Sequence, residues 1–196
     1  EATVSYGTGA AQGPAAIIAA SHQLERLVNG QETCARGIFT HPPINCQQPI
    51  ETVMSDLRQL TSAIAARGHV PVTLGGEHSL SYGAVMGLVD ALNGPVGLVH
   101  IDAHADFRNA YQGHKHSHAS VMHLLAGEGL PMASFGVRAL AAEEEAGRRA
   151  HGVICHDGPE LVRGQISAVN LPDDFPENIY VTFDLDGLDP SVLPAT

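Results

Sequence analysis

The sequence predicts an α/β fold in three layers, a mostly parallel β-sheet with helices on both faces. Short apolar runs rich in β-branched residues, such as residues 96–101, are typical of buried strands. They alternate with longer stretches that have apolar residues at helical spacing, which is the pattern of parallel-sheet proteins. The 196 residues, 44% of them hydrophobic, suffice for one core. Because no repeat or linker is visible, we expect a single domain over residues 1–196.

The first elements follow from spacing and from end signals. A helix is expected over residues 14–28, because a proline opens it and an Asn-Gly pair follows it. A second helix is expected over residues 50–67, with apolar side chains at helical spacing and Gly68 as its C-cap. A short strand is expected over residues 70–74.

The rest of the chain alternates regularly around a central strand over residues 96–101. Further helices are expected over residues 79–92, 119–126, 141–150 and 159–168. Further strands are expected over residues 132–137, 153–155 and 179–183. In the helix over residues 141–150, Glu144 and Arg148, and likewise Glu145 and Arg149, stand four residues apart, so each pair is expected to form an ion pair.

The composition narrows the class of partner. The formal net charge of −11 argues against nucleic acid and against anionic membrane surfaces. It suits a small cationic substrate, although ordinary acidic solubility explains it equally well. Three cysteines without a CxxC spacing indicate a reducing compartment. Neither a secretory leader nor an apolar run of ~18 residues is visible, so we expect a cytoplasmic location and no membrane span.

Six side chains that can bind a metal come directly after three of the expected strands. They are His78, Asp102, His104, Asp106, Asp184 and Asp186. Asp102, His104 and Asp106 stand at alternate positions, and alternate residues of an extended chain face one way. Their side chains can therefore converge, that of Asp106 by curling back where the strand becomes a loop. The carboxyl ends of parallel strands meet at one edge of a sheet, and ligands bind there. We therefore expect all six side chains to lie together.

Each of these residues alone also has an ordinary structural interpretation. His78 could lie at a helix start or in the core, and Asp184 and Asp186 could form a turn. Together the carboxylates would lack counter-charge, because the chain has only 10 Lys and Arg, and just Arg108 and Lys115 lie near the second strand end. Two divalent cations that share bridging carboxylates would supply it. Oxygen and imidazole donors without cysteine favour Mn²⁺, with Zn²⁺, Co²⁺ or Fe²⁺ as substitutes in vitro.

Four motifs resemble those of the ureohydrolase family, which includes arginase, agmatinase and formimidoylglutamase. They are GGEHS at residues 75–79, HIDAHAD at residues 100–106, SHASVM at residues 117–122 and FDLDGLDP at residues 183–190. Their order and spacing match the family over nearly the whole chain, which implies an arginase-like fold. The SHASVM motif, followed by FGVRA, is most similar to the agmatinase branch.

The resemblance implies a role for each matched metal position. One Mn²⁺ would be held by His78, Asp102, Asp106 and Asp184, and the other by Asp102, His104, Asp184 and Asp186. Asp102 and Asp184 would bridge the two ions, giving two Mn²⁺ per subunit. The resemblance also implies a homo-oligomer, a trimer or a hexamer.

The resemblance implies hydrolysis of a small cationic guanidino substrate. A hydroxide formed between the ions would attack the guanidinium carbon. The leaving amine must then be protonated, and Asp106 is the candidate that carries this proton to it. His118 matches the histidine that exchanges protons with solvent, a task suited to imidazole; Ala119 stands where the arginase-type motif has glycine. The products would be urea and a primary amine, which for agmatine is putrescine.

Several alternatives remain open. The substrate could be that of arginase, guanidinobutyrase or formimidoylglutamase. A dinuclear phosphoesterase fits less well, because such sites add asparagine and further histidine ligands. Family members have a strand before the position of Glu1 and continue past Thr196, where an acidic residue contacts the guanidinium. We therefore expect a domain incomplete at both termini, or else a non-catalytic metal-binding assembly subunit.

Overall fold

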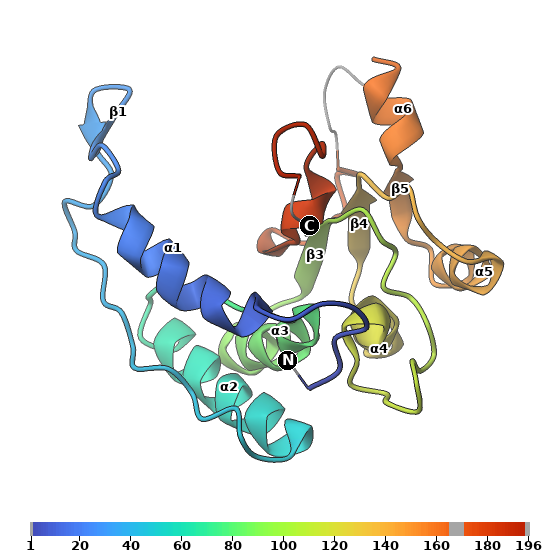
Figure 1. The fold of residues 1–196 in the computed structure, drawn as a ribbon, viewed down its shortest axis with the longest axis horizontal. Helices are drawn as coiled ribbons and strands as arrows, with labels where there is room; N and C mark the ends of the chain where they lie inside the picture. Colours follow the sequence, from blue (N-terminus) through green and yellow to red (C-terminus); the bar gives the residue numbers. More distant parts are fainter. Residues whose placement is uncertain (1, 165–170, 195–196) are drawn as a thin grey trace.

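A four-stranded parallel sheet forms the centre of the computed structural model, which describes residues 2–164 and 171–194 (Figure 1). In sheet order the strands are Ile154–His156 (β5), Met132–Phe135 (β4), Val96–Ile101 (β3) and Asn178–Phe183 (β6). All three pairings are parallel, so the four carboxyl ends share one edge of the sheet. The predicted α/β fold with a parallel sheet is confirmed, and each of these strands lies where one was expected.

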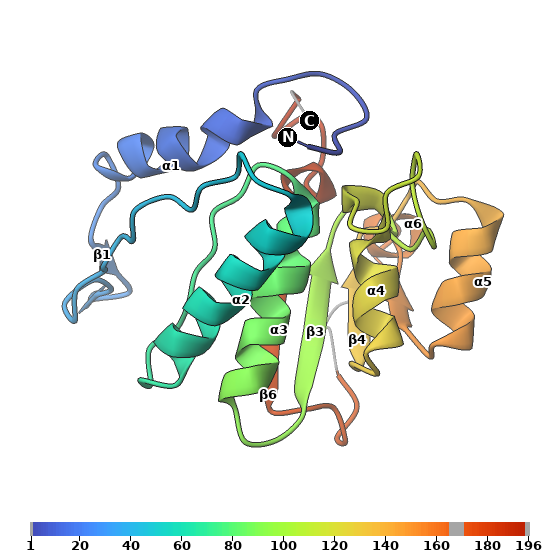
Figure 2. The same cartoon turned by 90° about the horizontal axis from the view of Figure 1, so that it is seen from below.

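Helices pack against one face of this sheet. Ser81–Ala91 (α3) and Val121–Gly127 (α4) lie directly in front of it in Figure 2, and Ile50–Ala65 (α2) lies along α3. These helices lie where the sequence predicts them, within a few residues at their ends. In the described part of the chain, no helix is both long and apolar enough to cross a membrane.

The core lies between the sheet and these helices. Leu98 of β3 is fully buried against Val85 of α3 and against Met122 and Leu125 of α4. This burial explains the apolar run of β3, in which only Val99 and Ile101 are partly exposed. The core therefore fixes β3, whose carboxyl end leads into the candidate site.

The contact between α2 and α3 depends on a glycine. A Cβ at Gly87 would overlap the Thr61 hydroxyl and the Arg58 carbonyl oxygen of α2. We expect Gly87→Ala to lower the free energy of unfolding by about 1–3 kcal/mol, because the backbones must separate to admit the methyl group. Thermal denaturation measures this loss. Gly127→Ala is the matched control, because nothing lies within 4 Å of its added Cβ; equal melting temperatures for the two variants would contradict the prediction.

The helix expected over residues 14–28 is wrong in its second half. The observed helix, Gly13–Ser21 (α1), ends earlier, and Leu27–Val28 (β1) pairs antiparallel with Gln31–Glu32 (β2). The Asn-Gly pair between these strands has φ values of 50° and 77°. Those values suit the two-residue hairpin turn that Asn-Gly favours, so the pair marks a hairpin and not a helix end.

The strand expected over residues 70–74 is also wrong, because the structure has no strand at these positions. Val70 and Val72 are 86% and 79% exposed. The β-branched residues have a strand's propensity, but a strand also needs a hydrogen-bonded neighbour and a face to bury.

One of the two predicted ion pairs of helix Ala142–Ala150 (α5) is wrong. Arg149 pairs with Glu145 as expected. Arg148 instead binds the carboxylate of Asp157 with two hydrogen bonds, of 2.9 and 3.0 Å. Glu144 is only 4% exposed and accepts hydrogen bonds from the backbone N–H groups of residues 107 and 141, at 3.1 and 2.8 Å. Its carboxylate is thus used as a helix cap, which spacing alone does not reveal.

The last predicted helix is only partly observed. Gly158–Val162 (α6) covers the start of the helix expected over residues 159–168. Residues 165–168 of that prediction lie outside the described residues.

Candidate metal centre

All six predicted metal ligands lie at the carboxyl edge of the sheet. His78 opens the short 3₁₀ helix His78–Leu80 (η2), directly before α3. Asp102 follows β3, and Asp184 follows β6 and precedes the 3₁₀ turn Leu185–Gly187 (η4). Segments far apart in the sequence are thus brought together by the parallel order of β3 and β6.

The loops around Asp102 have local features that aim their carboxylates. Asp106 has a positive φ of 50°, a conformation that is uncommon for a residue with a side chain and that clusters at functional sites. A Cβ at Gly187 would lie 2.9 Å from the backbone nitrogen of Asp102, so only glycine lets these loops approach this closely. Asp186 accepts a hydrogen bond of 3.0 Å from the backbone of Ala103, which ties the two loops together.

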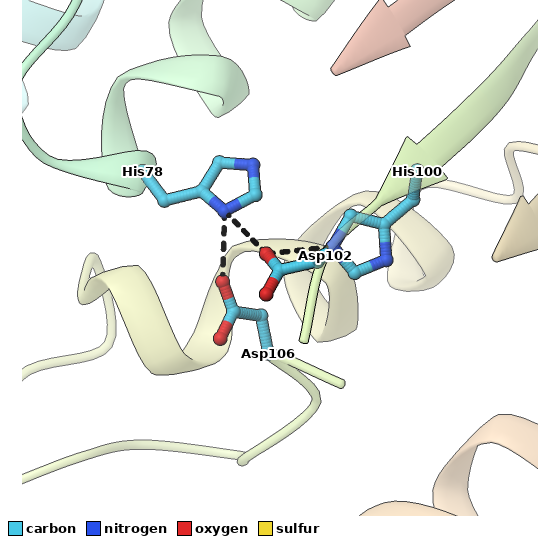
Figure 3. A group of neighbouring side chains, drawn as sticks. All are labelled: His78, His100, Asp102 and Asp106. Carbon is cyan, nitrogen blue, oxygen red and sulfur yellow. Dashed lines mark hydrogen bonds and ion pairs between the residues drawn. The ribbon is translucent and has the colours of Figure 1, made fainter. Parts of the chain in front are cut away.

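The first cluster surrounds His78. The Nδ1 atom of His78 lies 3.0 Å from Asp102 Oδ2, 3.0 Å from Asp106 Oδ2 and 3.6 Å from Asp184 Oδ2. Figure 3 shows the imidazole of His78 pointing between the carboxylates of Asp102 and Asp106. Four donors, from the start of η2 and from the ends of β3 and β6, therefore converge on one small volume.

The second cluster lies on the other side of Asp102. Nδ1 of His104 is 3.0 Å from Asp186 Oδ2 and 3.5 Å from Asp102 Oδ1. The ligand atoms of Asp102, His104 and Asp186 all lie within 4.8 Å of one another. Asp102 thus belongs to both clusters and presents a different oxygen to each, the arrangement expected of a carboxylate that bridges two cations.

The imidazoles in this site are held in an environment that favours positive charge. Burial alone would lower the pKa of His78, but the carboxylates of Asp102 and Asp106 outweigh it and raise the pKa well above its usual value. Hydrogen bonds with Asp102 and Asp186 raise the pKa of His104 to about 10.

The carboxylates respond to the same crowding. Burial alone would raise the pKa of Asp102, but the imidazoles of His100, His104 and His78 hold it below its usual value. Asp184 shows the opposite net effect: burial, followed by the negative charge of Asp102, raises its pKa. Negative charge has thus accumulated beyond what the imidazoles neutralise, and a bound cation would relieve it.

The hydrogen bonding and charge pairing around His78 also fit a metal site. Nδ1 of His78 is buried, yet in the described structure it has no hydrogen bond of ordinary geometry. The nearby guanidinium groups do not compensate the carboxylates: Arg108 turns toward Glu144, at 3.8 Å, and Arg138 donates to the backbone oxygen of Asp186, at 2.6 Å. A buried imidazole nitrogen that faces several carboxylates belongs to the donor set of a divalent cation that accepts oxygen and nitrogen.

Sequence reasoning missed His100 as a member of this site. It is fully buried, and its Nδ1 lies 3.0 Å from the hydroxyl of Ser134, while its Nε2 lies 3.1 Å from Asp102 Oδ2 (Figure 3). Because both ring nitrogens already have partners, we interpret His100 as a residue that orients Asp102, not as a ligand. Thr182 has the same relation to His78, through a contact of 2.8 Å with its Nε2. His100 stands two residues before Asp102, and Thr182 stands two residues before Asp184, each on the same strand face as that expected ligand. This spacing is the signal that could have found them.

The predicted proton carrier His118 lies beside the clusters, not within them. It opens the 3₁₀ helix His118–Ser120 (η3), which contacts η2. Its ring nitrogens lie 3.4 Å from the hydroxyls of Ser5 and Ser117. The structure thus places His118 next to the element that carries His78.

The fold and the site define a class: an α/β protein with a candidate metal centre of histidines and aspartates at the carboxyl ends of parallel strands. The chain belongs to the arginase family, whose family model matches residues 1–196. It is similar to the N(1)-aminopropylagmatine ureohydrolase of Synechocystis sp., with 30% identity covering 99% of this chain and 66% of the relative. It is also similar to the agmatinase of Pyrococcus horikoshii, with 30% identity covering 100% of this chain and 68% of the relative.

A solved structure supports the same assignment. The agmatine ureohydrolase of Thermoplasma volcanium superposes with a TM-score of 0.81 at 30% identity, covering 98% of this chain and 66% of that one. The predicted resemblance to the ureohydrolases, nearest the agmatinase branch, and the predicted arginase-like fold are confirmed. The chain spans about two thirds of the length of these three relatives.

Metal removal is expected to destabilise the protein. A metal that binds only the folded chain stabilises it by about 2.7 kcal/mol at a free concentration of 100 Kd. For a domain of this size we therefore expect Mn²⁺ to raise the melting temperature by roughly 5–10 °C. Calorimetry of the chelator-treated chain with and without added Mn²⁺ measures the difference, with Ca²⁺ as the control ion. Equal melting temperatures in all three samples would argue against a metal centre.

Proposed function

We propose that this chain is the metal-binding part of a dinuclear-manganese hydrolase that acts on a guanidino group. The reaction we propose is agmatine plus water giving putrescine plus urea. The observation that carries this proposal is the pair of His/Asp clusters that share Asp102 at the carboxyl edge of the sheet. The printed names of the relatives, agmatinase and N(1)-aminopropylagmatine ureohydrolase, support this type of substrate.

The proposed ligands are those implied by the motifs. His78, Asp106 and Asp184 would hold one Mn²⁺, His104, Asp184 and Asp186 the other, and Asp102 both. When bound, the two cations supply Lewis acidity, which makes hydroxide available near neutral pH and polarises the substrate.

The chain's own residues would move the protons. Asp106 faces the first cluster and would accept the proton of the attacking water and pass it to the leaving amine. His118, half-buried beside η2, would exchange that proton with solvent. The surplus of carboxylates would also attract a cationic guanidinium to this edge of the sheet.

A urea-release assay in the presence of Mn²⁺ tests the proposal. Agmatine, N(1)-aminopropylagmatine, arginine and 4-guanidinobutyrate are compared as substrates, and agmatine is expected to have the highest kcat/KM. A preference for arginine or 4-guanidinobutyrate would replace agmatinase by another ureohydrolase. Metal binding without urea from any of the four would favour the alternative, a non-catalytic metal-binding assembly subunit.

We also propose an assembly and a cellular location. A trimer or hexamer of identical chains is proposed from the resemblance to the family. A cytoplasmic location is proposed because Cys34, Cys46 and Cys155 are free thiols, as expected in a reducing compartment.

A further inference from the structure

The N-terminal loop, residues 3–13, arches over the edge of the sheet that carries the candidate site (Figure 2). Its first end is fixed to the residue before His78. The backbone N–H of Thr3 donates a hydrogen bond of 3.0 Å to one carboxylate oxygen of Glu77, and the Thr3 hydroxyl donates to the other. Thr3 is only 8% exposed, so these hydrogen bonds are shielded from water. The loop is therefore anchored to the element that presents His78.

The second end of the loop is fixed to the same turn. A Cβ at Gly76 would lie 2.6 Å from the carbonyl oxygen of Ala10, so the two backbones are in close contact. A Cβ at Gly13 would lie 3.5 Å from the carbonyl oxygen of Gly75. With both ends held at residues 75–77, the loop has a defined position over the site.

Between these anchors, Ser5 reaches His118. Its Oγ lies 3.4 Å from Nε2 of His118, and the hydroxyl of Ser117 lies 3.4 Å from Nδ1 of the same ring. Tyr111 packs its ring against the imidazole edge-on, with centroids 5.6 Å apart. The imidazole thus has a hydroxyl at each nitrogen and an aromatic wall.

We propose that Ser5 is a positioning residue for His118, held in place by the Thr3–Glu77 anchor. This inference rests on the proposed function, in which His118 exchanges protons with solvent. A hydroxyl can both donate and accept, so Ser5 can keep its hydrogen bond whether Nε2 carries a proton or not. A carboxylate in the same place would only accept and would favour the protonated ring, whereas a hydroxyl needs only to rotate its O–H to follow the ring as it gains or loses a proton.

The test compares four variants in the Mn²⁺-loaded full chain. Ser5→Ala is expected to lower kcat three- to ten-fold with KM changed less than two-fold, and Ser5→Thr is expected to restore kcat to within two-fold. Thr3→Val, which removes one anchoring hydrogen bond, is expected to lower kcat in the same direction by a smaller factor. Thr8→Ala, an exposed position in the same loop, is the matched control and is expected to be unchanged.

A second measurement does not depend on turnover. Nitrogen-15 NMR of the histidine rings reports tautomer and hydrogen bonding, and the His118 signal is assigned by its loss in His118→Asn. Ser5→Ala is expected to shift the His118 Nε2 resonance, and Thr8→Ala to leave it in place. A Ser5→Ala chain that hydrolyses agmatine with wild-type kcat, or whose His118 signal is unmoved, would overturn the inference. Failure of the wild-type chain to release urea would instead overturn the proposed function.

Discussion

Replacing Asp102 by asparagine is expected to abolish hydrolysis, lowering kcat on the order of 10³-fold or more, and to reduce bound Mn²⁺ from two ions per chain to at most one. Asparagine has nearly the same shape but no negative charge, and its amide nitrogen cannot bind a cation. Asp102 is buried and presents Oδ2 to His78 and Oδ1 to His104. A single substitution therefore removes a ligand from both clusters. Metal analysis of the desalted protein and the urea assay measure the two effects.

A surface aspartate gives the control for this variant. Asp56 lies on α2 and bonds only to Gln48 among the contacts of the described structure. We expect Asp56→Asn to keep both ions and full activity. Full metal content in Asp102→Asn would show that the two clusters do not share this carboxylate.

Replacing His118 by asparagine is expected to lower kcat about 10²-fold while both Mn²⁺ ions stay bound. The reason is that His118 lies beside the clusters and not within them, so its loss removes a proton carrier but no ligand. Small imidazole-like buffers are expected to restore part of the lost rate, because they can carry the proton in place of the side chain. Steady-state kinetics with and without added imidazole, together with metal analysis, separate these effects.

His114 is the matched control, because it is an exposed histidine four residues earlier in the same loop. His114→Asn is expected to keep kcat within two-fold. Loss of metal from His118→Asn would instead make His118 a ligand and remove the proposed proton-transfer role.

The sequence predicts the parallel strands well because the residues that define each strand are neighbours in the sequence. The apolar run of β3 and the turn residues that precede it give its bounds, and the structure places it at Val96–Ile101 as expected. Elements whose formation depends on a neighbour are predicted badly. The stretch at residues 70–74 has the residues of a strand without a strand partner. The Asn-Gly pair at residues 29–30 has the sequence of a helix end but forms a hairpin turn.

In the candidate site too, some residues can be predicted from local sequence, and others depend on a distant neighbour. Five of the six expected ligands could be named because metal-binding side chains at the ends of parallel strands must converge. The inference for His78 depends on a strand over residues 70–74 that is not observed. The two-residue spacing places His100 on the same strand face as Asp102, but its role as the partner of Asp102 depends on Ser134 occupying its other nitrogen, which only the structure shows. The contact of Ser5 with His118 joins residues 113 positions apart and depends on the path of the N-terminal loop, which no local pattern specifies.

The central claim is that two manganese ions bind side by side with Asp102 between them. Electron paramagnetic resonance of the Mn²⁺-loaded chain tests it most directly, because ions bridged by one carboxylate are magnetically coupled. We predict the spectrum of a coupled pair in the wild type and its loss in Asp102→Asn. The spectrum of isolated Mn²⁺ in the fully loaded wild-type chain would contradict the account.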